Sequence, residues 1–394
     1  MGIVVRNCDF SLVPSNLSLA NAIGRPDFTH RLKVFLAATS LATTYGGPAY
    51  SVSRLAASLA GVGAEIGLWT ADDSGARGML ISEDSAVTIL RGSEAEALKA
   101  FGRPDVVHDN GIWLRHNHRL ATIAWRNKVP RIVSTRGMLE PWAMQHKALK
   151  KRIAWVAYQK NDLRSASCFH ASTEVEAANI EALKLGVPIQ VIPNGVDVPG
   201  VASRTGETAG MHERGECRTA LFLGRIYPVK GLPMLIEAWN RVRPSGWRLR
   251  IVGPDEAGHL AELRNAVSDA RLDDCVLFEG AVRGDSKISE FMNADLFILP
   301  THSESFGMVV AEALSFGIPV LTTHAAPWPQ LGSLNCGWRI NPDVNDLARG
   351  LAIATSTDSK TLLEMGARGR ALMQDEYRWE KVAEKTMALY RDVL

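Results

Sequence analysis

The stretch Leu296-Phe297-Ile298-Leu299-Pro300-Thr301-His302-Ser303-Glu304-Ser305-Phe306-Gly307-Met308-Val309-Val310-Ala311-Glu312-Ala313 has the pattern of one strand-loop-helix unit. The apolar run 296–299 predicts a buried strand, and the residues after Gly307 predict an amphipathic helix. Glu304 stands in the loop and Glu312 about two turns later, so both carboxylates can face the space beyond the strand end. The helix N-terminus offers unpaired N–H groups to anionic or polyhydroxyl ligands. A carboxylate such as Glu312 can accept hydrogen bonds from vicinal hydroxyls, as on a ribose.

The same alternation of short apolar runs and amphipathic stretches continues along the chain from Lys33, which is typical of a parallel sheet covered by helices. It predicts the α/β class. The alternation stops near residues 193–195, and residues 199–216 are rich in Gly, Ser, Thr and charge, as in a linker. Two doubly wound halves predict a ligand cleft beyond the carboxyl ends of their strands. The expected strands are 32–36, 64–69, 105–108, 131–134, 168–171 and 189–192, then 219–224, 247–252, 275–279, 295–299 and 318–322.

The length of 394 residues suggests two domains, since a domain has about 150 residues. Hydrophobic residues at 46% and charged residues at 22% exclude disordered and fibrous classes, and a net charge of +2 disfavours a nucleic-acid partner. Residues 1–197 carry +5 and the remainder −3. Much of the first-half excess lies between Lys147 and Arg164, beside Trp142, Trp155 and Tyr158. This segment is either a solvated basic helix or a surface that docks on an anionic membrane.

Cysteine spacing and hydropathy point to a cytoplasmic protein. The five cysteines are odd in number, widely spaced and without C-x-x-C, so we expect neither a disulfide framework nor a zinc site. No run approaches the roughly 18 apolar residues of a membrane span. Residues 1–30 lack the basic-then-apolar order of a signal peptide and are interpreted as an N-terminal extension. We therefore expect a cytoplasmic location, with at most peripheral contact at the inner face of the cytoplasmic membrane.

A second strand-end loop is Gly224-Arg225-Ile226-Tyr227-Pro228-Val229-Lys230-Gly231. Arg225 is a planar, bidentate cation and Lys230 a point charge. A diphosphate is the natural partner of two such cations, whereas the alternative is a structural ion pair.

A third loop, Thr44-Tyr45-Gly46-Gly47-Pro48, follows the first strand. Its glycines either let the backbone approach a ligand closely or form a plain tight turn, and Pro48 suits the first turn of a helix. The chain contains neither the G-x-G-x-x-G fingerprint nor a G-x-x-x-x-G-K-[ST] phosphate loop, which disfavours dehydrogenases and P-loop enzymes.

Two more strand ends in the first half carry polar residues. His108-Asp109-Asn110-Gly111-Ile112-Trp113 begins where the strand 105–108 is expected to end, so His108 is expected to face the cleft and a ligand. In Ser134-Thr135-Arg136-Gly137-Met138-Leu139-Glu140-Pro141-Trp142, Arg136 and Glu140 could contact an acceptor, although Glu140 could equally cap the next helix.

In combination, E-S-F-G-x4-E at 304–312, Arg225 with Lys230, Asn194-Gly195-Val196-Asp197 and the Gly46-Gly47 loop resemble the retaining nucleotide-sugar glycosyltransferases of family 4. The resemblance extends from about residue 31 to residue 394. It implies the GT-B fold, two facing Rossmann-like domains with a deep cleft between them. The strings H-D-N-G-I-W-L and R-G-M-L-E-P-W-A are similar to a bacterial subgroup associated with exopolysaccharide and lipopolysaccharide assembly. The implied parts are an extension at 1–30, an acceptor-side domain at 31–197, a linker at 198–217, a nucleotide-sugar domain at 218–376 and a last helix at 377–394 that crosses back to the first domain.

The resemblance also implies a role for each matching residue. Arg225 and Lys230 would hold the donor diphosphate, Glu312 the donor ribose, and Glu304 the sugar. His108 matches the first His of the family's H-x-H pattern, whereas Asn110 stands where the second is usual, so which of the two reaches the sugar is open. The implied catalytic residues are Arg225, Lys230, Glu304 and His108; the donor-binding residues are Gly46, Gly47, Asn194, Gly224, Ser305, Phe306, Gly307, Met308 and Glu312; the acceptor-side residues are Asn110, Trp113, Arg136 and Glu140.

The implied reaction transfers a hexose from a UDP- or GDP-linked sugar to a glycan or lipid-linked oligosaccharide, with retention of configuration. The chain has no D-x-D sequence, so Arg225 and Lys230 would stabilise the leaving diphosphate in place of a metal. No cofactor is expected beyond the nucleotide-sugar co-substrate. A sugar-nucleotide epimerase of the same fold is the alternative enzyme. A phosphorylase of this architecture would need a much longer chain, and a catalytically silent binding protein would tolerate the loss of Glu304 or Arg225.

Overall fold

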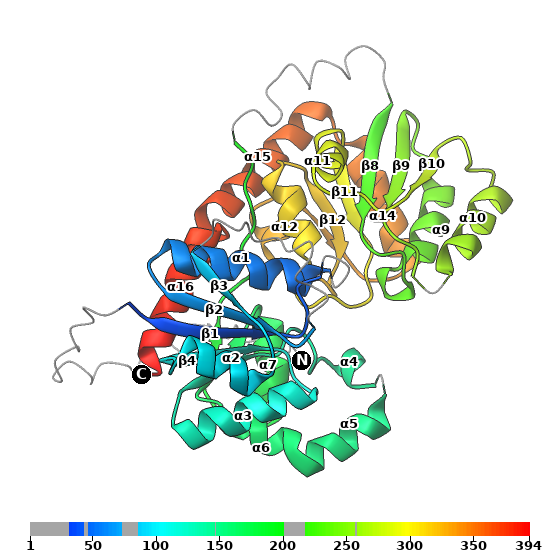
Figure 1. Cartoon of the computed structure of the whole chain (residues 1–394). Coiled ribbons are helices and arrows are strands. Elements are labelled where there is room, and N and C mark those ends of the chain that lie inside the picture. The colour runs from blue at the N-terminus through cyan, green and yellow to red at the C-terminus, as the bar shows by residue number, and fades with distance from the viewer. Residues whose placement is uncertain (1–30, 43–45, 73–85, 146, 201–216, 257) are drawn as a thin grey trace, which may run out of the picture. The chain divides into compact units, whose positions relative to one another are not determined.

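Two parallel sheets, one from each half of the chain, form the scaffold (Figure 1). The computed structural model describes residues 31–42, 46–72, 86–145, 147–200, 217–256 and 258–394. The first sheet has the strand order β3-β2-β1-β4-β5-β6-β7, and the second has the order β10-β9-β8-β11-β12-β13. In both sheets the order reverses beside the first strand, which is the doubly wound arrangement. The predicted α/β class with two Rossmann-like sheets is confirmed.

The first half follows the strand-helix alternation that its sequence predicts. Its strands are β1 (Lys33–Ala38), β2 (Glu65–Thr70), β3 (Val87–Leu90), β4 (Val106–Asn110), β5 (Arg131–Ser134), β6 (Cys168–Ala171) and β7 (Ile189–Val191). Its helices are α1 (Gly47–Gly61), α2 (Glu94–Phe101), α3 (Arg115–Asn127), α4 (Pro141–Gln145), α5 (Ala148–Ala154), the π-helical turn η3 (Trp155–Gln159), α6 (Lys160–Arg164) and α7 (Glu174–Glu181).

The second half repeats the pattern. Its strands are β8 (Arg218–Leu223), β9 (Trp247–Val252), β10 (Val276–Glu279), β11 (Leu296–Leu299), β12 (Val320–Thr323) and β13 (Gly337–Ile340). Its helices are the 3₁₀ turn η5 (Pro228–Lys230), α9 (Leu232–Val242), α10 (His259–Asp269), α11 (Asp285–Met292), α12 (Met308–Ser315), α13 (Gln330–Ser333), α14 (Val344–Ser356), α15 (Ser359–Glu376) and α16 (Trp379–Asp392).

The sequence pattern missed β3 and β13 and ended β4 too early. Strands β3 and β13 have four residues each and are not uniformly buried, so they lack the long apolar run of a central strand. Strand β4 continues two residues past His108, because Asp109 and Asn110 still pair in parallel register with β5. His108 therefore lies inside a strand rather than at its end.

The last helix, α16, packs on the first sheet. Its residues Trp379 and Tyr390 share one hydrophobic core with Leu36 of β1, and Figure 1 shows α16 beside α1. The segment before α16 also contacts the end of the first half of the chain, since the amide N–H of Val196 donates to the carbonyl oxygen of Tyr377 at 2.7 Å. Residues Leu32–Leu394 form one compact unit. The domain bounds given above stay predictions, and both residues 1–30 and most of the linker lie outside the described residues.

Candidate active site

Two strand-end loops of the second sheet lie against each other. Strands β8 and β11 are neighbours, so the loops that follow them, 224–231 and 300–307, leave the same edge of the sheet. The Oγ1 of Thr301 lies 3.1 Å from the carbonyl oxygen of Val229 and 2.8 Å from that of Ser303, and its one hydrogen can be shared between them. The amide of His302 donates to Val229 as well, at 2.8 Å. These bonds hold the two loops together.

Lys230 and Glu304, one from each loop, form an enclosed ion pair. The Nζ of Lys230 lies 2.6 Å from Oε2 of Glu304, and the two side chains are only 14% and 15% exposed. A pair with so little exposure is screened less by water and salt than a surface pair. Because an ammonium has three donors, Lys230 can hold Glu304 and still donate to a second anion.

Arg225 is placed differently from Lys230. Its side chain is 56% exposed and pairs with Glu256 at 2.9 Å, while the guanidinium lies 6.0 Å from the centre of the Tyr227 ring. An exposed pair of this kind contributes little to stability, so Arg225 can leave Glu256 at small cost. The structural ion pair considered from the sequence is therefore present, and it leaves the cation accessible to an anionic ligand.

Glu312 extends from α12 and has one oxygen held and one oxygen free. Its Oε1 lies 2.5 Å from Nζ of Lys287 on α11, and its Oε2 is buried with no hydrogen-bond partner among the described residues. Burial raises the pKa of Glu312, which Lys287 counteracts and Asp197 reinforces. A buried carboxylate oxygen without a donor is unfavourable unless a ligand supplies one.

The helix α12 begins at a sharp turn close to the first half of the chain. Gly307 has a φ of 79°, a conformation that glycine adopts readily, and it directly precedes the first residue of α12. Phe306 is buried, and its carbonyl oxygen accepts a hydrogen bond from the indole of Trp328 at 2.6 Å. A Cβ atom added to Gly47, at the start of α1, would lie 3.9 Å from Met308. Thr44 and Tyr45 of the glycine loop lie outside the described residues.

The loop 303–305 also touches two loops of the first half. The hydroxyl of Ser303 lies 3.4 Å from Oε2 of Glu140, and the hydroxyl of Thr173 lies 3.4 Å from the carbonyl oxygen of Ser305. A Cβ added to Gly137 would lie 2.7 Å from the Cβ of Ser305. Burial raises the pKa of Glu140 to about 7, and the nearby carboxylates of Glu176 and Glu304 add to the shift.

His108, which we expected to face a ligand, is fully buried in a hydrogen-bond network. Its Nδ1 lies 2.7 Å from the Tyr390 hydroxyl on α16, and its Nε2 lies 2.8 Å from Oγ of Ser134, which also contacts His170 at 2.9 Å. Burial holds the pKa of His108 well below its ordinary value, so the ring is neutral. With both ring nitrogens engaged, the structure gives His108 a structural role, and contact with a sugar stays a prediction.

The other polar residues predicted in the first half divide into two groups. Arg136 donates to the side-chain oxygens of Asn110 and Asn194, so these three residues form one cluster. Trp113 points elsewhere: its indole donates to Met138 at 3.3 Å and packs against Trp155. Sequence reasoning missed the partners that orient the site, above all Lys287, because nothing in a single sequence pairs it with Glu312.

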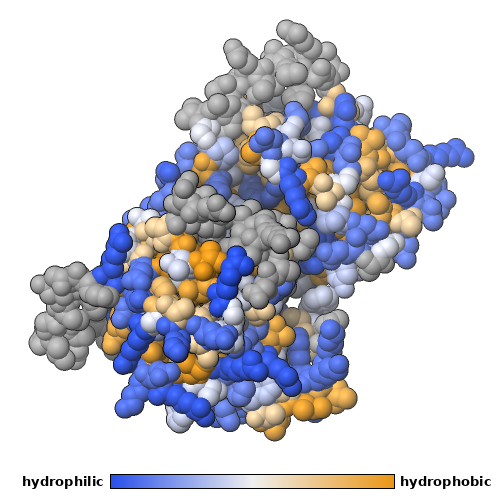
Figure 2. Space-filling model, viewed as in Figure 1, coloured by the Kyte–Doolittle hydropathy of each residue, from blue (hydrophilic) through white to orange (hydrophobic). Residues whose placement is uncertain are grey.

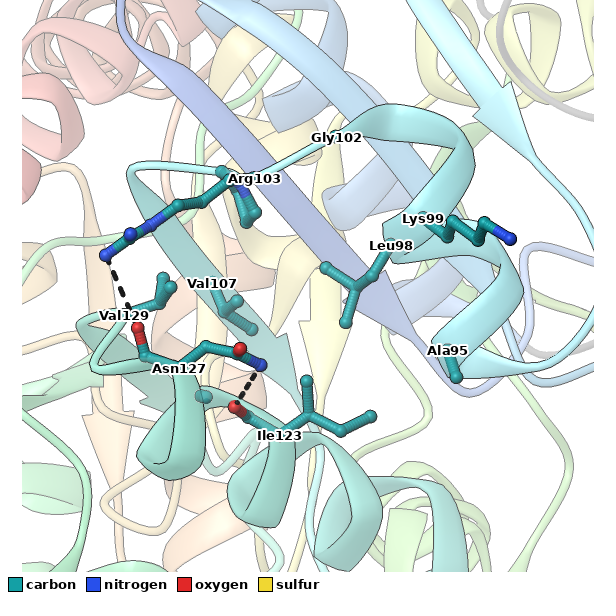
Figure 3. A pocket seen from close by; sticks show the side chains of 11 residues that line it. Ala95, Leu98, Lys99, Gly102, Arg103, Val107, Ile123, Asn127 and Val129 are labelled. Atoms are coloured by element: carbon teal, nitrogen blue, oxygen red, sulfur yellow. Dashed lines mark hydrogen bonds between the residues drawn. The ribbon is translucent and has the colours of Figure 1, made fainter.

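The described residues contain no group of three or more His, Cys, Asp or Glu that could hold a metal ion. A hollow between α2 and α3 is lined by Leu98, Val107 and Ile123, with Lys99 and Arg103 at its sides (Figure 3). It lies near the start of β4, away from the carboxyl-end loops that carry the candidate site.

Comparisons with known proteins agree with the observed fold. Residues 46–195 match the model of the glycosyl transferase 4-like domain, and residues 217–391 match that of glycosyl transferases group 1. The chain is 27% identical to a D-inositol 3-phosphate glycosyltransferase of Acidothermus cellulolyticus, over 76% of this chain and 70% of that protein. It is 26% identical to a GDP-mannose:cellobiosyl-diphosphopolyprenol alpha-mannosyltransferase of Xanthomonas campestris, over 75% of this chain and 76% of that protein. The structure of Anabaena HepE in complex with UDP superposes with a TM-score of 0.73 at 17% identity, covering 92% of this chain and 100% of that one.

Fold and family match together define a nucleotide-sugar glycosyltransferase of the GT-B type. The chain belongs to glycosyltransferase family 4 and is a hexosyltransferase.

Proposed function

We propose that the protein is a retaining hexosyltransferase that uses a UDP- or GDP-linked sugar as donor. The observation that carries the donor half of this proposal is the Glu312 carboxylate. Lys287 holds its Oε1, while its Oε2 is buried and lacks a donor. The 2′- and 3′-hydroxyls of a ribose are two adjacent donors that suit these oxygens. Gly47, which lies near the start of α12, would let the nucleotide's phosphates approach the backbone.

The transfer step needs negative charge to be stabilised on the leaving diphosphate while the anomeric carbon becomes positive. Lys230 and Arg225 supply cations, and the N–H groups at the start of α12 supply dipoles that are already oriented. Glu304 would hold Lys230 in place and accept hydrogen bonds from the sugar hydroxyls. Retention follows if the acceptor hydroxyl attacks from the face that the diphosphate leaves, with a phosphate oxygen taking its proton. The bond to the acceptor forms as the bond to the phosphate breaks, and no covalent enzyme intermediate is needed.

For the acceptor we propose a glycan or a lipid-linked oligosaccharide of bacterial surface polysaccharide assembly. The names of two relatives support acceptors of different kinds, an inositol phosphate in one and a diphosphopolyprenol-linked cellobiose in the other. The strings around His108 and Arg136, which resemble the polysaccharide subgroup, favour the second kind.

A thermal-shift panel of UDP, GDP, ADP, UDP-glucose and GDP-mannose tests the donor. We expect the nucleotides that carry one of the three bases to raise Tm, because a ligand at one hundred times its Kd stabilises the folded state by about 2.7 kcal/mol. With that donor and an acceptor, NMR of the product should show the anomeric configuration of the donor. Incubation without acceptor should release nucleotide but no epimer, whereas a new epimer would favour the epimerase. If none of the five compounds raised Tm, the proposal would be overturned.

We also propose that the segment α4–α6 docks on an anionic membrane. The side chains of Leu149, Ile153 and Val156 are 72%, 63% and 83% exposed. Leu149 and Ile153 are four residues apart on α5 and so share one face, and Val156 follows in the π-helical turn η3. Figure 2 shows hydrophobic side chains at the surface where Figure 1 places α5. Lys150 and Arg152 stand exposed beside them. The described residues contain no helix long and apolar enough to cross a membrane.

Reversing the charges of Lys150 and Arg152 to Glu is expected to lower binding to phosphatidylglycerol vesicles about tenfold or more. Each basic side chain near an anionic surface contributes about 1 kcal/mol, and reversal adds repulsion. Lys151 is a poor choice, since its ammonium already donates to the carbonyl oxygen of Ala143 at 2.5 Å. Vesicle sedimentation measures the effect, and the same reversal at the exposed Lys360 and Arg391 is the control. Equal sedimentation of both double variants would remove the membrane proposal.

A further inference from the structure

The guanidinium of Arg136 is partly buried and donates to two neutral amides. Its Nε and Nη2 donate to Oδ1 of Asn110 at 3.2 and 2.6 Å, and its Nη1 donates to Oδ1 of Asn194 at 2.7 Å. The Asn110 amide is itself fixed, because its Nδ2 donates to the carbonyl oxygen of Ala37 at 3.2 Å. An arginine has five N–H donors, so one on each Nη remains for a further acceptor.

No carboxylate forms an ion pair with Arg136 within the described part of the chain. Arg131, at the start of the preceding strand β5, is a direct contrast, because its buried guanidinium pairs with Asp109 at 3.0 Å. Burial lowers the pKa of Arg136 to about 10, so the side chain is still protonated at neutral pH. A buried charge without a counter-ion is costly, and a bound anion removes that cost.

The charge of Glu176 raises the pKa of Arg136, yet both carboxylate oxygens of Glu176 already accept hydrogen bonds from other groups. Its Oε1 accepts from the hydroxyl of Thr135 at 2.6 Å and from the amide of Gly137 at 2.8 Å. Its Oε2 accepts from the amide and the hydroxyl of Ser172, both at 2.8 Å. Glu176 thus fixes the backbone on either side of Arg136 and does not bind the guanidinium itself. The rigid loop explains how Arg136 keeps a φ of 51°, which is uncommon for residues other than glycine.

Arg136 stands next to the loop that we assign to the sugar. The following residue is Gly137, whose added Cβ would lie 2.7 Å from the Cβ of Ser305, in the E-S-F-G loop. A group held by Arg136 would therefore be close to the loop that we assign to the transferred sugar. The two cations assigned to the diphosphate, Arg225 and Lys230, belong to a different loop of the second sheet.

We propose that Arg136 binds a negatively charged oxygen group of the substrate other than the donor diphosphate, and so selects an anionic sugar or acceptor. This inference rests on the proposed function. The carboxylate of a uronosyl donor and a phosphate on the acceptor share the required chemistry, since either accepts two parallel N–H bonds from a guanidinium. Asn110 and Asn194 orient the guanidinium, and Glu176 orients the loop.

Calorimetry on the full chain tests both sources of the anion. In the donor arm, UDP-glucuronate is compared with UDP-glucose; in the acceptor arm, inositol 1-phosphate is compared with inositol, with and without UDP. We expect the wild type to bind the anionic member of one pair about tenfold more tightly. Arg136→Gln should reduce that preference to within threefold and leave the Kd of UDP within threefold, while Arg136→Lys should retain part of it. Arg126→Gln, on an exposed position of α3, is the matched control.

Three results would overturn the assignment. One is the absence of any anionic preference in both arms, with or without nucleotide bound. Another is a loss of UDP affinity in Arg136→Gln as large as the loss for the anionic probe, because the anion would then be the diphosphate. The third is an unchanged preference in Arg136→Gln, provided that its melting curve shows a folded protein. Binding of UDP by the wild type without an anionic preference would leave the proposed function intact, which separates the two failures.

Discussion

Replacing Lys230 with alanine is expected to lower kcat/KM for the donor by about 10²–10³-fold. Removing one preorganised group that stabilises developing charge in an enclosed site typically has this effect on the chemical step. Lys230 satisfies both conditions, since its side chain is only 14% exposed and its ammonium lies 2.6 Å from Oε2 of Glu304. Nucleotide release from the donor, followed with and without acceptor, measures the change. Lys360→Ala, at an exposed position of α15, is the control.

Arg225→Ala is expected to lower kcat/KM less than Lys230→Ala does. Because Arg225 is 56% exposed and its partner Glu256 is 36% exposed, water partly replaces the lost cation, and a smaller loss of about tenfold is expected. Lys230→Ala also leaves Glu304 without its cation, so Glu304→Gln is measured alone and with Lys230→Ala. Strong non-additivity would show that the two residues act as a unit. If Lys230→Ala and Arg225→Ala each left kcat/KM within threefold of the wild type, the metal-free stabilisation of the diphosphate would be wrong.

The fold was largely predictable because a parallel strand that is buried on both faces consists mainly of consecutive apolar residues. β11 is an example, since all four of its residues are apolar and buried. The helix start at Gly307 was predictable too, because glycine, a preceding loop and a following apolar periodicity coincide there. Elements of four residues with exposed positions, such as β3, carry too little of this pattern.

The candidate site was less predictable, because its electrostatics depend on contacts between distant parts of the chain. The Nδ1 of His108 is engaged by the hydroxyl of Tyr390, which is 282 residues away in the sequence. Glu312 has its counter-ion on a different helix, at Lys287. Position along the chain does not reveal whether a side chain already has its partners. Only the three-dimensional arrangement distinguishes the engaged His108 from the open oxygen of Glu312.

Glu312→Gln is expected to raise the Kd of the preferred nucleoside diphosphate about 10- to 100-fold. A hydrogen bond to a charged group contributes about 1.5–3 kcal/mol, and the amide offers only one acceptor oxygen in place of two. Calorimetry measures the effect, with Glu364→Gln at an exposed position of α15 as the control.

The 2′-deoxynucleotide shows whether the ribose is the group that Glu312 binds. If it is, the deoxynucleotide should bind the wild type more weakly but lose little further in Glu312→Gln, because both changes remove the same bond. If removing the 2′-hydroxyl weakened binding equally in the wild type and in Glu312→Gln, the Glu312 carboxylate would not be the group that binds the ribose. Lys287→Met tests the direction of the pKa shift of Glu312. Burial raises the pKa of Glu312 and Lys287 lowers it, so removing Lys287 should raise that pKa further. Since only the carboxylate form accepts two bonds, nucleotide affinity falls as the pH decreases, and in Lys287→Met this fall should begin at a higher pH than in the wild type.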